Sequence, residues 1–424
     1  MIVQTTLACV LLSTRVALAS NVYPVTDTNQ RYCYDSYHAS STSSNEEDPD
    51  SDTQERAHRR AQELALTNTR NLDGFSCPGS GQDASYSGLK QLFQNNDDGT
   101  ISDLNTGLMW TQHVYSEGLT YSQVESELSI FQLGGHSDWR VPTIKELYTL
   151  SEFNGEKGNS RETNIPYIDN TVFNVKYGNM HYMDGQVWSS TQYTGAILHN
   201  PNSDCNFGFN SIDGRIECNE RSSTRLNARF VRGHTNIGRN AFSTSGNSTD
   251  IIVDTATGLE WARSDSGVAL DWDEALDYCN DLELGGLTDW KLPDAHELQS
   301  IVDYSRSPDA TDSPAIDSLF YSTQIENEAG QADWGWYWTS TTHLDGIPLG
   351  SNAVYIAFGR AMGHLETHDG TAVGAVDLHG AGAQRSDRKV GATSPKDIGP
   401  PGDCHRVYNY ARCVRGSSSP SAIA

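Results

Sequence analysis

Apolar residues recur at helical spacing at two places in each half of the chain. After Asp271 the apolar positions lie on one face of a helix, and Glu274 completes a capping box with Asp271. A second helix is expected after the next Pro, where Asp294 and Glu297 form the same pair. The corresponding pairs in the first half are Thr120 with Gln123 and Thr143 with Glu146.

Short aromatic or β-branched runs follow these helical segments. Residues 354–358 (Val-Tyr-Ile-Ala-Phe) are typical, and turn-rich segments separate them from the next run. Such runs predict short antiparallel strands. Each half is therefore expected to be a compact α+β unit with two helices.

The two halves are copies of one another. Residues 103–110 (Asp-Leu-Asn-Thr-Gly-Leu-Met-Trp) return at 254–261 as Asp-Thr-Ala-Thr-Gly-Leu-Glu-Trp. Three further blocks return in the same order: 134–147 at 285–298, 187–191 at 337–341, and 228–233 at 411–416. Solenoid repeats are about 20 to 50 residues long, so a longer period indicates duplicated domains.

The repeat and the composition divide the chain into five parts. These are a signal peptide (1–19), an N-terminal segment that is partly flexible (20–85), a first repeat domain (86–236), a second repeat domain (237–416) with a long loop at 365–403, and a tail (417–424). The signal peptide is expected because an apolar run precedes Ala17-Leu18-Ala19. No later stretch approaches the roughly 20 apolar residues of a membrane span. The sequence therefore predicts export to the periplasm, the cell surface or the medium.

Charge narrows the choice of partners. The chain carries 29 Lys and Arg against 55 Asp and Glu, a net charge of −26. Polyanions bind to clustered cations, so nucleic acid is not expected as a partner and sulfated glycans are disfavoured. An acidic, hydrated surface suits a secreted protein.

The seven cysteines after the signal peptide are expected to form disulfides, as is usual in exported proteins. Cys279 aligns with Leu128 of the first repeat, and Cys413 aligns with Phe230. Two positions that are both cysteine in one copy and both apolar in the other are expected to touch in the core. The remaining pairs are Cys33 with Cys77 and Cys205 with Cys218, which leaves Cys404 over; a bridge between Cys404 and Cys413 is the alternative.

The repeated blocks resemble a known family. Thr-Gly-Leu-Met-Trp, Ser-Asp-Trp-Arg-Val-Pro-Thr-Ile-Lys-Glu-Leu, Trp-Ser-Ser-Thr and Arg-Cys-Val-Arg-Gly are similar to motifs of the C-terminal domain of the Legionella collagen-like adhesin. The resemblance covers about residues 90–235 and 250–416. It implies a compact domain related to C-type lectins and, in one branch, adhesion to sulfated glycans through a basic surface, from which this acidic chain departs. The Trp-Arg-Val-Pro block is also similar to formylglycine-generating enzymes, a likeness of fold only.

Candidate contact residues come from the second repeat. The six tryptophans inside the repeated blocks are expected in the core, whereas Trp334 and Trp336 lie just outside a block and are expected at the surface. The segment 377–387 resembles the family's loop, so we expect ligand contacts from Asp377, His379, Arg385 and Asp387.

Metal chemistry is the main alternative to a pure binding role. His364, His368, Asp377 and His379 form a group of ligand types that suit Zn²⁺, and the acidic turn near Asp97 could hold Ca²⁺. The commoner roles of such residues are exposed loop histidines and solvated turns, so no cofactor is expected. We therefore predict a non-catalytic binding or adhesion protein for a glycan or protein ligand. The alternatives are a metal-dependent oxidase or hydrolase and a structural envelope protein.

Overall fold

A computed structural model describes most of both repeats. The described residues are 22–34, 80–178, 181–198, 200, 202–246, 248–346, 349–366, 372–391 and 402–416. The predicted signal peptide, Cys77, His368 and the tail lie outside these ranges. None of the helices among the described residues has the length and hydropathy of a membrane span.

The first repeat is a β-rich α+β unit that follows a single 3-10 turn, η1 (Asp83–Ser85). Its elements are β1 (Phe93–Asn95), β2 (Thr100–Asp103), β3 (Met109–Thr111), β4 (Tyr115–Leu119), α2 (Tyr121–Leu128), α3 (Ile144–Tyr148), β5 (Gln186–Gln192), β6 (Cys205–Asn210), β7 (Arg215–Glu220), β8 (Leu226–Ala228) and β9 (Val231–Arg232).

The second repeat has the same plan with additions. Its elements are β10 (Phe242–Thr244), β11 (Ile251–Asp254), β12 (Glu260–Ala262), α4 (Trp272–Asn280), α5 (Ala295–Ser300), α6 (Pro308–Thr311), β13 (Gln324–Glu326), β14 (Ala332–Trp334), β15 (Trp336–His343), β16 (Asn352–Ala357), β17 (Met362–Glu366), β18 (Ala372–Asp377), β19 (Gln384–Arg388) and β20 (Val414–Arg415).

The four predicted helices begin where the sequence places them. Helices α2, α3, α4 and α5 each start with a capping box formed by the predicted pair of residues. In α5, for example, the Asp294 side chain accepts from the Glu297 amide, while the Glu297 side chain accepts from the Asp294 amide. These bonds satisfy backbone donors that a helix start otherwise leaves unpaired.

Matching four-stranded sheets show that the duplication is structural. The order β1-β2-β3-β9 in the first repeat corresponds to β10-β11-β12-β20 in the second. Each sheet brings the last strand of its repeat beside a strand from the Thr-Gly-Leu block. The six tryptophans of the repeated blocks are buried, as predicted: Trp110, Trp139, Trp188, Trp261, Trp290 and Trp338.

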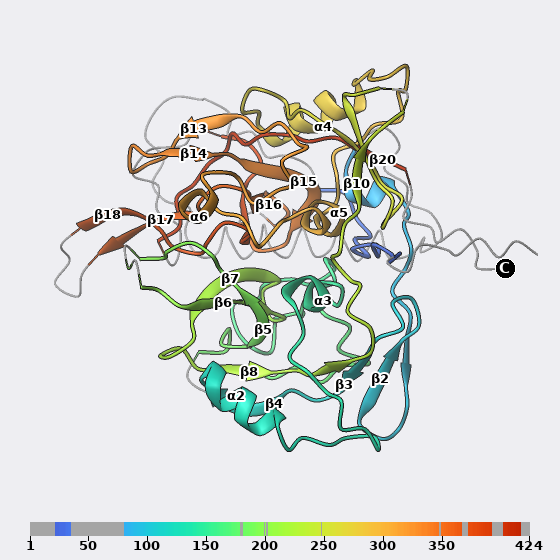
Figure 1. Cartoon of the computed structure of the whole chain (residues 1–424), viewed down its shortest axis with the longest axis vertical. Coiled ribbons are helices and arrows are strands. Elements are labelled where there is room, and N and C mark those ends of the chain that lie inside the picture. Colours follow the sequence, from blue (N-terminus) through green and yellow to red (C-terminus); the bar gives the residue numbers. More distant parts are fainter. Residues whose placement is uncertain are drawn as a thin grey trace, which may run out of the picture.

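A single sheet joins the repeats. Its eight strands run in the order β15-β16-β19-β7-β6-β5-β8-β4, so strands of the second repeat continue into those of the first. Figure 1 shows β15 and β16 in the upper half of the molecule and β7, β6, β5 and β8 in the lower half. The junction is the antiparallel pair β19 and β7, where Gln384 lies opposite Ile216. The expectation of one long loop over 365–403 is therefore wrong, because β18 and β19 lie inside it and β19 occupies the position that β7 has in the first repeat.

Helices α3 and α5 make reciprocal contacts across the same junction. Lys145 of α3 donates to the Ser300 carbonyl at 2.7 Å, and His296 of α5 bonds to the Ser151 hydroxyl at 2.7 Å. Lys145 and His296 occupy equivalent positions of the two repeats. The largest hydrophobic cluster includes buried side chains from both repeats, so the core is shared.

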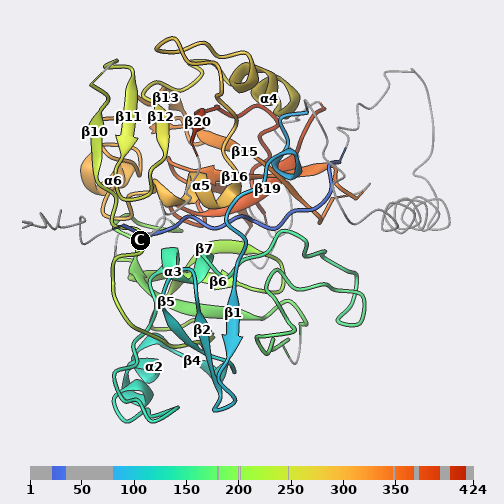
Figure 2. The same ribbon diagram turned by 90° about the vertical axis from the view of Figure 1, so that its right-hand side faces the viewer.

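The N-terminal segment 22–34 lies between the two repeats (Figure 2). The Tyr23 amide donates to Ala256 of the second repeat, and the Thr28 carbonyl accepts from Phe153 of the first. Gln30 donates to the Thr342 carbonyl at 2.7 Å. This part of the predicted N-terminal segment is thus an ordered connection between the two domains.

The disulfides follow the predicted pattern. Cys279 is bonded to Cys413, and Leu128 and Phe230 belong to one hydrophobic cluster at the equivalent place in the first repeat. Cys205 is bonded to Cys218.

Two further cysteines, Cys33 and Cys404, lie in the described part of the chain. Cys404 is free and buried, so the alternative bridge between Cys404 and Cys413 does not form. Cys33 is in a disulfide, and its predicted partner Cys77 lies outside the described residues.

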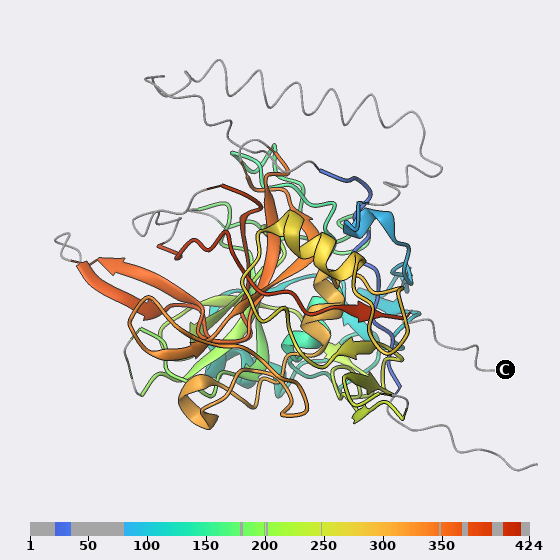
Figure 3. The ribbon, with the colours of Figure 1, turned by 90° about the horizontal axis from the view of Figure 1, so that it is seen from above.

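A β-hairpin distinguishes the second repeat. Strands β17 and β18 pair only with each other among the described strands and project from the body of the molecule (Figure 3). The hairpin leads into the turn before β19. It therefore places residues 377–387 at the junction of the repeats and not on a free surface.

Candidate functional site

The two tryptophans expected at the surface are buried. Trp336 is 1% exposed and stacks on Tyr355, with ring centroids 4.6 Å apart, while the Arg406 guanidinium covers it at 3.9 Å. Trp334 ends β14 and is also buried. The prediction of exposure was wrong because Trp336 begins β15 and belongs to the hydrophobic cluster of the second repeat, while Trp334 is buried at the end of β14, outside that cluster.

Asp377 is held at the end of β18 by three donors. Its carboxylate accepts from the Tyr193 hydroxyl at 2.8 Å and from the amides of Ala361 and Gly380. Burial raises the pKa of Asp377 to about 7, although these hydrogen bonds oppose the shift. Asp377 also lines a cleft of about 820 Å³ together with Arg360. Its bonds hold the hairpin to the first repeat.

His379 and Arg385 belong to a ring of four charged side chains that crosses the junction. Glu217 of β7 accepts from Arg385 at 3.0 Å and lies 3.2 Å from the His379 imidazole. Asp403 completes the ring, because its carboxylate lies 2.6 Å from both His379 and Arg385. Burial favours neutral carboxyl groups, but His379 and Arg385 lower the pKa of Glu217 to about 2 and that of Asp403 below its ordinary range.

Both ring nitrogens of His379 face carboxylate oxygens. An ionised carboxylate only accepts hydrogen bonds, and a neutral imidazole carries a single N–H, so protonated His379 fits this ring best. Burial and Arg385 disfavour the imidazolium, yet the two carboxylates raise the pKa of His379. We refer to Glu217, His379, Arg385 and Asp403 as the charged ring.

The Asp387 side chain makes its contacts inside the second repeat. Its carboxylate bonds to His405 at 2.7 Å and accepts from the Arg406 amide at 2.6 Å. It is buried and therefore does not present a free acid to solvent. Of the other predicted contact residues, Arg385 lines one cleft and Asp377 another, and their contact with a ligand stays a prediction.

The predicted metal group is not assembled in the part of the chain that the structure describes. There, no cluster of three or more His, Cys, Asp or Glu side chains has a geometry that could hold an ion. His364 lies on β17, His368 is outside the described ranges, and Asp377 and His379 have the partners given above. Asp377 and His379 therefore give no support to the alternative of a zinc site. The acidic turn at Asp97 is a hairpin turn between β1 and β2.

The carboxylates of the repeated Asp-Trp block are engaged in ion pairs. Asp138 binds Arg232, and the equivalent Asp289 binds Arg415. Glu146 binds Arg140 in addition to capping α3. The Asp pairs recur because they connect the residue before the repeated Trp to the last strand of each repeat, β9 or β20.

A polar cleft of about 640 Å³ lies beside the charged ring. Strands β6 and β7 form part of its wall, together with residues 181–186, which lead into β5, and residues 224–227 around β8. Lys157 and Arg385 are added from other parts of the chain. Four amide side chains contribute, namely Gln186, Asn210, Asn219 and Asn227. Most of the lining residues are polar or charged, so this lining favours a ligand that can form several hydrogen bonds.

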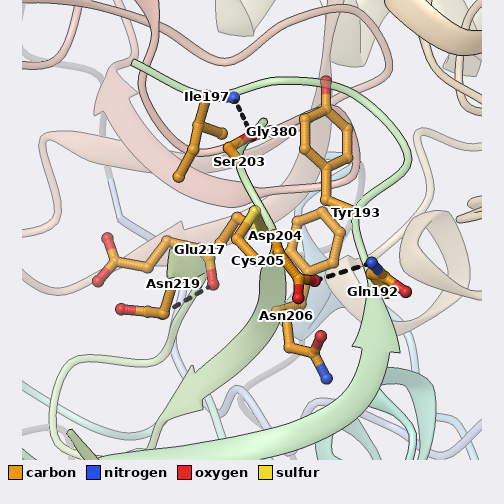
Figure 4. The surroundings of a disulfide bond; sticks show 12 residues. Gln192, Tyr193, Ile197, Ser203, Asp204, Cys205, Asn206, Glu217, Asn219 and Gly380 are labelled. Atoms are coloured by element: carbon orange, nitrogen blue, oxygen red, sulfur yellow. Dashed lines mark hydrogen bonds between the residues drawn. A yellow bond between two sulfur atoms is a disulfide. The ribbon is translucent and has the colours of Figure 1, made fainter. Parts of the chain in front are cut away.

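Alternation along β7 explains how the cleft is built. Arg215, Glu217 and Asn219 line the cleft, whereas Ile216 and Cys218 between them are buried, as a strand with period two requires. The disulfide from Cys218 to Cys205 ties β7 to β6 directly behind Glu217 and Asn219 (Figure 4). The Cys218 amide also donates to the His379 carbonyl, so the brace continues into the second repeat.

Sequence reasoning did not identify this cleft. The run Arg-Ile-Glu-Cys-Asn-Glu at 215–220 carries the alternation that marks a strand with one polar face. The participation of Arg385 carries no local signal, because it depends on the pairing of β7 with β19.

Comparison with known proteins settles the family. The model of the Lcl C-terminal domain matches residues 99–232 and again residues 250–376, together more than half of the chain. The chain belongs to the Lcl C-terminal domain family. The second Lcl C-terminal domain continues structurally beyond its match, since β20 pairs with β12 as β9 pairs with β3.

Two other comparisons found nothing. No curated protein matches the chain significantly, and neither does any solved structure. The relation of this Lcl C-terminal domain pair to C-type lectins and to formylglycine-generating enzymes therefore stays a prediction.

Proposed function

We propose that this protein is an exported, non-catalytic binding protein that works in adhesion at the bacterial surface. Its ligand, a glycan or a surface protein, would bind in the polar cleft at the junction of the repeats. Membership in the Lcl C-terminal domain family supports a surface role. The observation that carries the proposal is the cleft itself, a polar hollow of about 640 Å³ that is built on two braced strands.

The ionic state of the cleft supports binding over chemistry. Glu217 and Arg385 are paired with each other, and Arg215 is paired with Asp345 of the second repeat. Groups that are fixed by such pairs orient a ligand well but are not free to exchange protons. Tyr182 adds a half-buried aromatic ring whose hydroxyl is bonded to the Gly158 carbonyl.

The test is an array that carries both glycans and extracellular proteins, probed with the full chain in the presence and absence of Ca²⁺. We expect a ligand whose binding is lost in Tyr182→Ala and kept in Tyr321→Ala, an exposed tyrosine outside the cleft. Absence of any hit would overturn the proposal and favour a structural envelope protein.

One observation favours hydrolysis as a second candidate. Burial raises the pKa of Asp213 despite the nearby Arg215, whereas the pKa of Glu217 is lowered, and both carboxyl groups line the same cleft. Glycosidases separate the pKa values of two carboxyl groups in this way. Release of new reducing ends from a bound glycan, abolished by Asp213→Asn, would replace the binding proposal with this one.

A further inference from the structure

The amide side chains of the cleft have fixed orientations. Asn219 donates through Nδ2 to the Glu217 carbonyl, Asn227 donates to the Gln186 carbonyl, and Gln186 donates to the Glu217 carboxylate. Each partner oxygen can only accept, so each amide must turn its nitrogen toward it. The three amide oxygens are thereby directed elsewhere.

These oxygens are unoccupied acceptors. Within the described ranges, no group donates to Oδ1 of Asn219, Oδ1 of Asn227 or Oε1 of Gln186. None of the three belongs to the buried atoms that lack a partner, so all three are open to solvent. Because the three residues line one cleft, its wall presents acceptors to a ligand.

The cations of the cleft offer little to an anion. Arg385 uses Nε and both terminal nitrogens on Asp403 and Glu217. Arg215 is neutralised by Asp345 and Asp213. This leaves two cations among the lining residues.

Those two cations are Lys157 and Arg225. Arg225 already donates to the Gly118 carbonyl and to Gln123. The exposed carboxylate of Asp184 lines the same cleft, 3.6 Å from the imidazole of His181, and adds negative charge to the lining. A polyanion needs clustered free cations, so it is a poor match for this lining.

We propose, as a refinement that rests on the proposed function, that the cleft binds a neutral oligosaccharide through hydroxyl groups that donate to the amide oxygens. A sugar hydroxyl both donates and accepts hydrogen bonds, whereas a sulfate ester presents acceptor oxygens only. The half-buried Tyr182 ring supplies an amphipathic surface in the same lining. The site therefore selects against sulfated glycans by its hydrogen bonds as well as by its charge.

The experiment is calorimetric titration of the full chain with neutral hexaoses of gluco, manno and galacto configuration. Sulfated and uronic-acid oligosaccharides of the same length are titrated in parallel. At least one neutral hexaose should bind, and Asn219→Ala should weaken it about threefold to tenfold, the value of one hydrogen bond. The control Asn105→Ala should leave it unchanged, since Asn105 is also half-buried and donates to a carbonyl but does not line the cleft.

Asn219→Lys distinguishes the two ligand classes. An added ammonium should abolish binding of a neutral hexaose and should strengthen binding of a sulfated one. Tighter sulfated binding in this variant, with no neutral hexaose bound by the wild type, would overturn the refinement while leaving a binding function intact. Failure of both classes, together with no hit on the array, would remove the proposed function as well. Thermal melts of Asn219→Ala and Asn219→Lys verify that these two variants fold.

Discussion

Replacing Arg385 by Met tests the role of the charged ring most sharply. Arg385 is 3% exposed and neutralises two carboxylates, Glu217 of the first repeat and Asp403 of the second. Its loss leaves two negative charges facing one imidazolium across the junction. Removing one partner of a buried ion pair costs about 3 to 5 kcal/mol, because the remaining charge is buried without compensation.

The expected loss of stability can be expressed as a fall in melting temperature. At about 2 to 4 °C per kcal/mol for a domain of this size, the variant should melt roughly 6 to 20 °C below the wild type. Differential scanning calorimetry measures the shift directly. Arg232→Met is the matched control, because Arg232 forms a similar two-pronged pair with Asp138 at the surface, where solvent screens the charges.

A double variant separates charge from packing. In Arg385→Met with Glu217→Gln, the second change removes one of the uncompensated charges, so the pair should lose less stability than the sum of the single variants. If Arg385→Met melted near the wild-type temperature, as Arg232→Met is expected to do, the charged ring would contribute nothing to the stability of the junction. That result would refute the reasoning.

Three further outcomes are expected. The raised pKa of His379 gives stability that is present below about pH 6.5 and lost as the pH rises. The urea midpoint of the wild type should therefore fall above that pH, and His379→Gln should flatten this fall. An unchanged pH profile in the variant would contradict the prediction. The pKa of Asp377, raised to about 7, predicts stability that declines as the pH rises from about 4 to 7, and Asp377→Asn should lose this decline when unfolding is compared at the two ends of the range. Replacing Cys279 and Cys413 by the Leu and Phe of the first repeat should retain more stability than replacing both by Ser, which should cost about 2 to 5 kcal/mol; equal losses would count against the shared position.

Much of the fold was predictable because its determinants are local or repeated. Capping pairs such as Thr143 with Glu146 lie three residues apart, and their bonds form within one helical turn. The bridge between Cys279 and Cys413 could be predicted across 134 residues because the first repeat supplies an apolar pair at the same positions.

The site could be predicted only in part. Arg385 was predicted to contact a ligand, and it lines a cleft, but its contact with a ligand stays a prediction. The burial of Trp336 was missed because it depends on β15 beginning there and on Arg406, which lies 70 residues later, covering the ring. The part that Arg385 takes in the cleft could not be predicted, because it depends on the pairing of β7 with β19 and neither strand carries a signal for the other.

The proposed site depends on the two repeats acting as one body joined at β7 and β19, since this junction brings Arg385 into the cleft. Hydrogen exchange of the full chain, followed in peptides that cover residues 215–220 and 384–388, tests this directly. We predict slow exchange with a common rate in both strands, and a loss of protection in both strands in Arg385→Met. Rapid exchange of 384–388 beside a protected 215–220 in the wild type would contradict it.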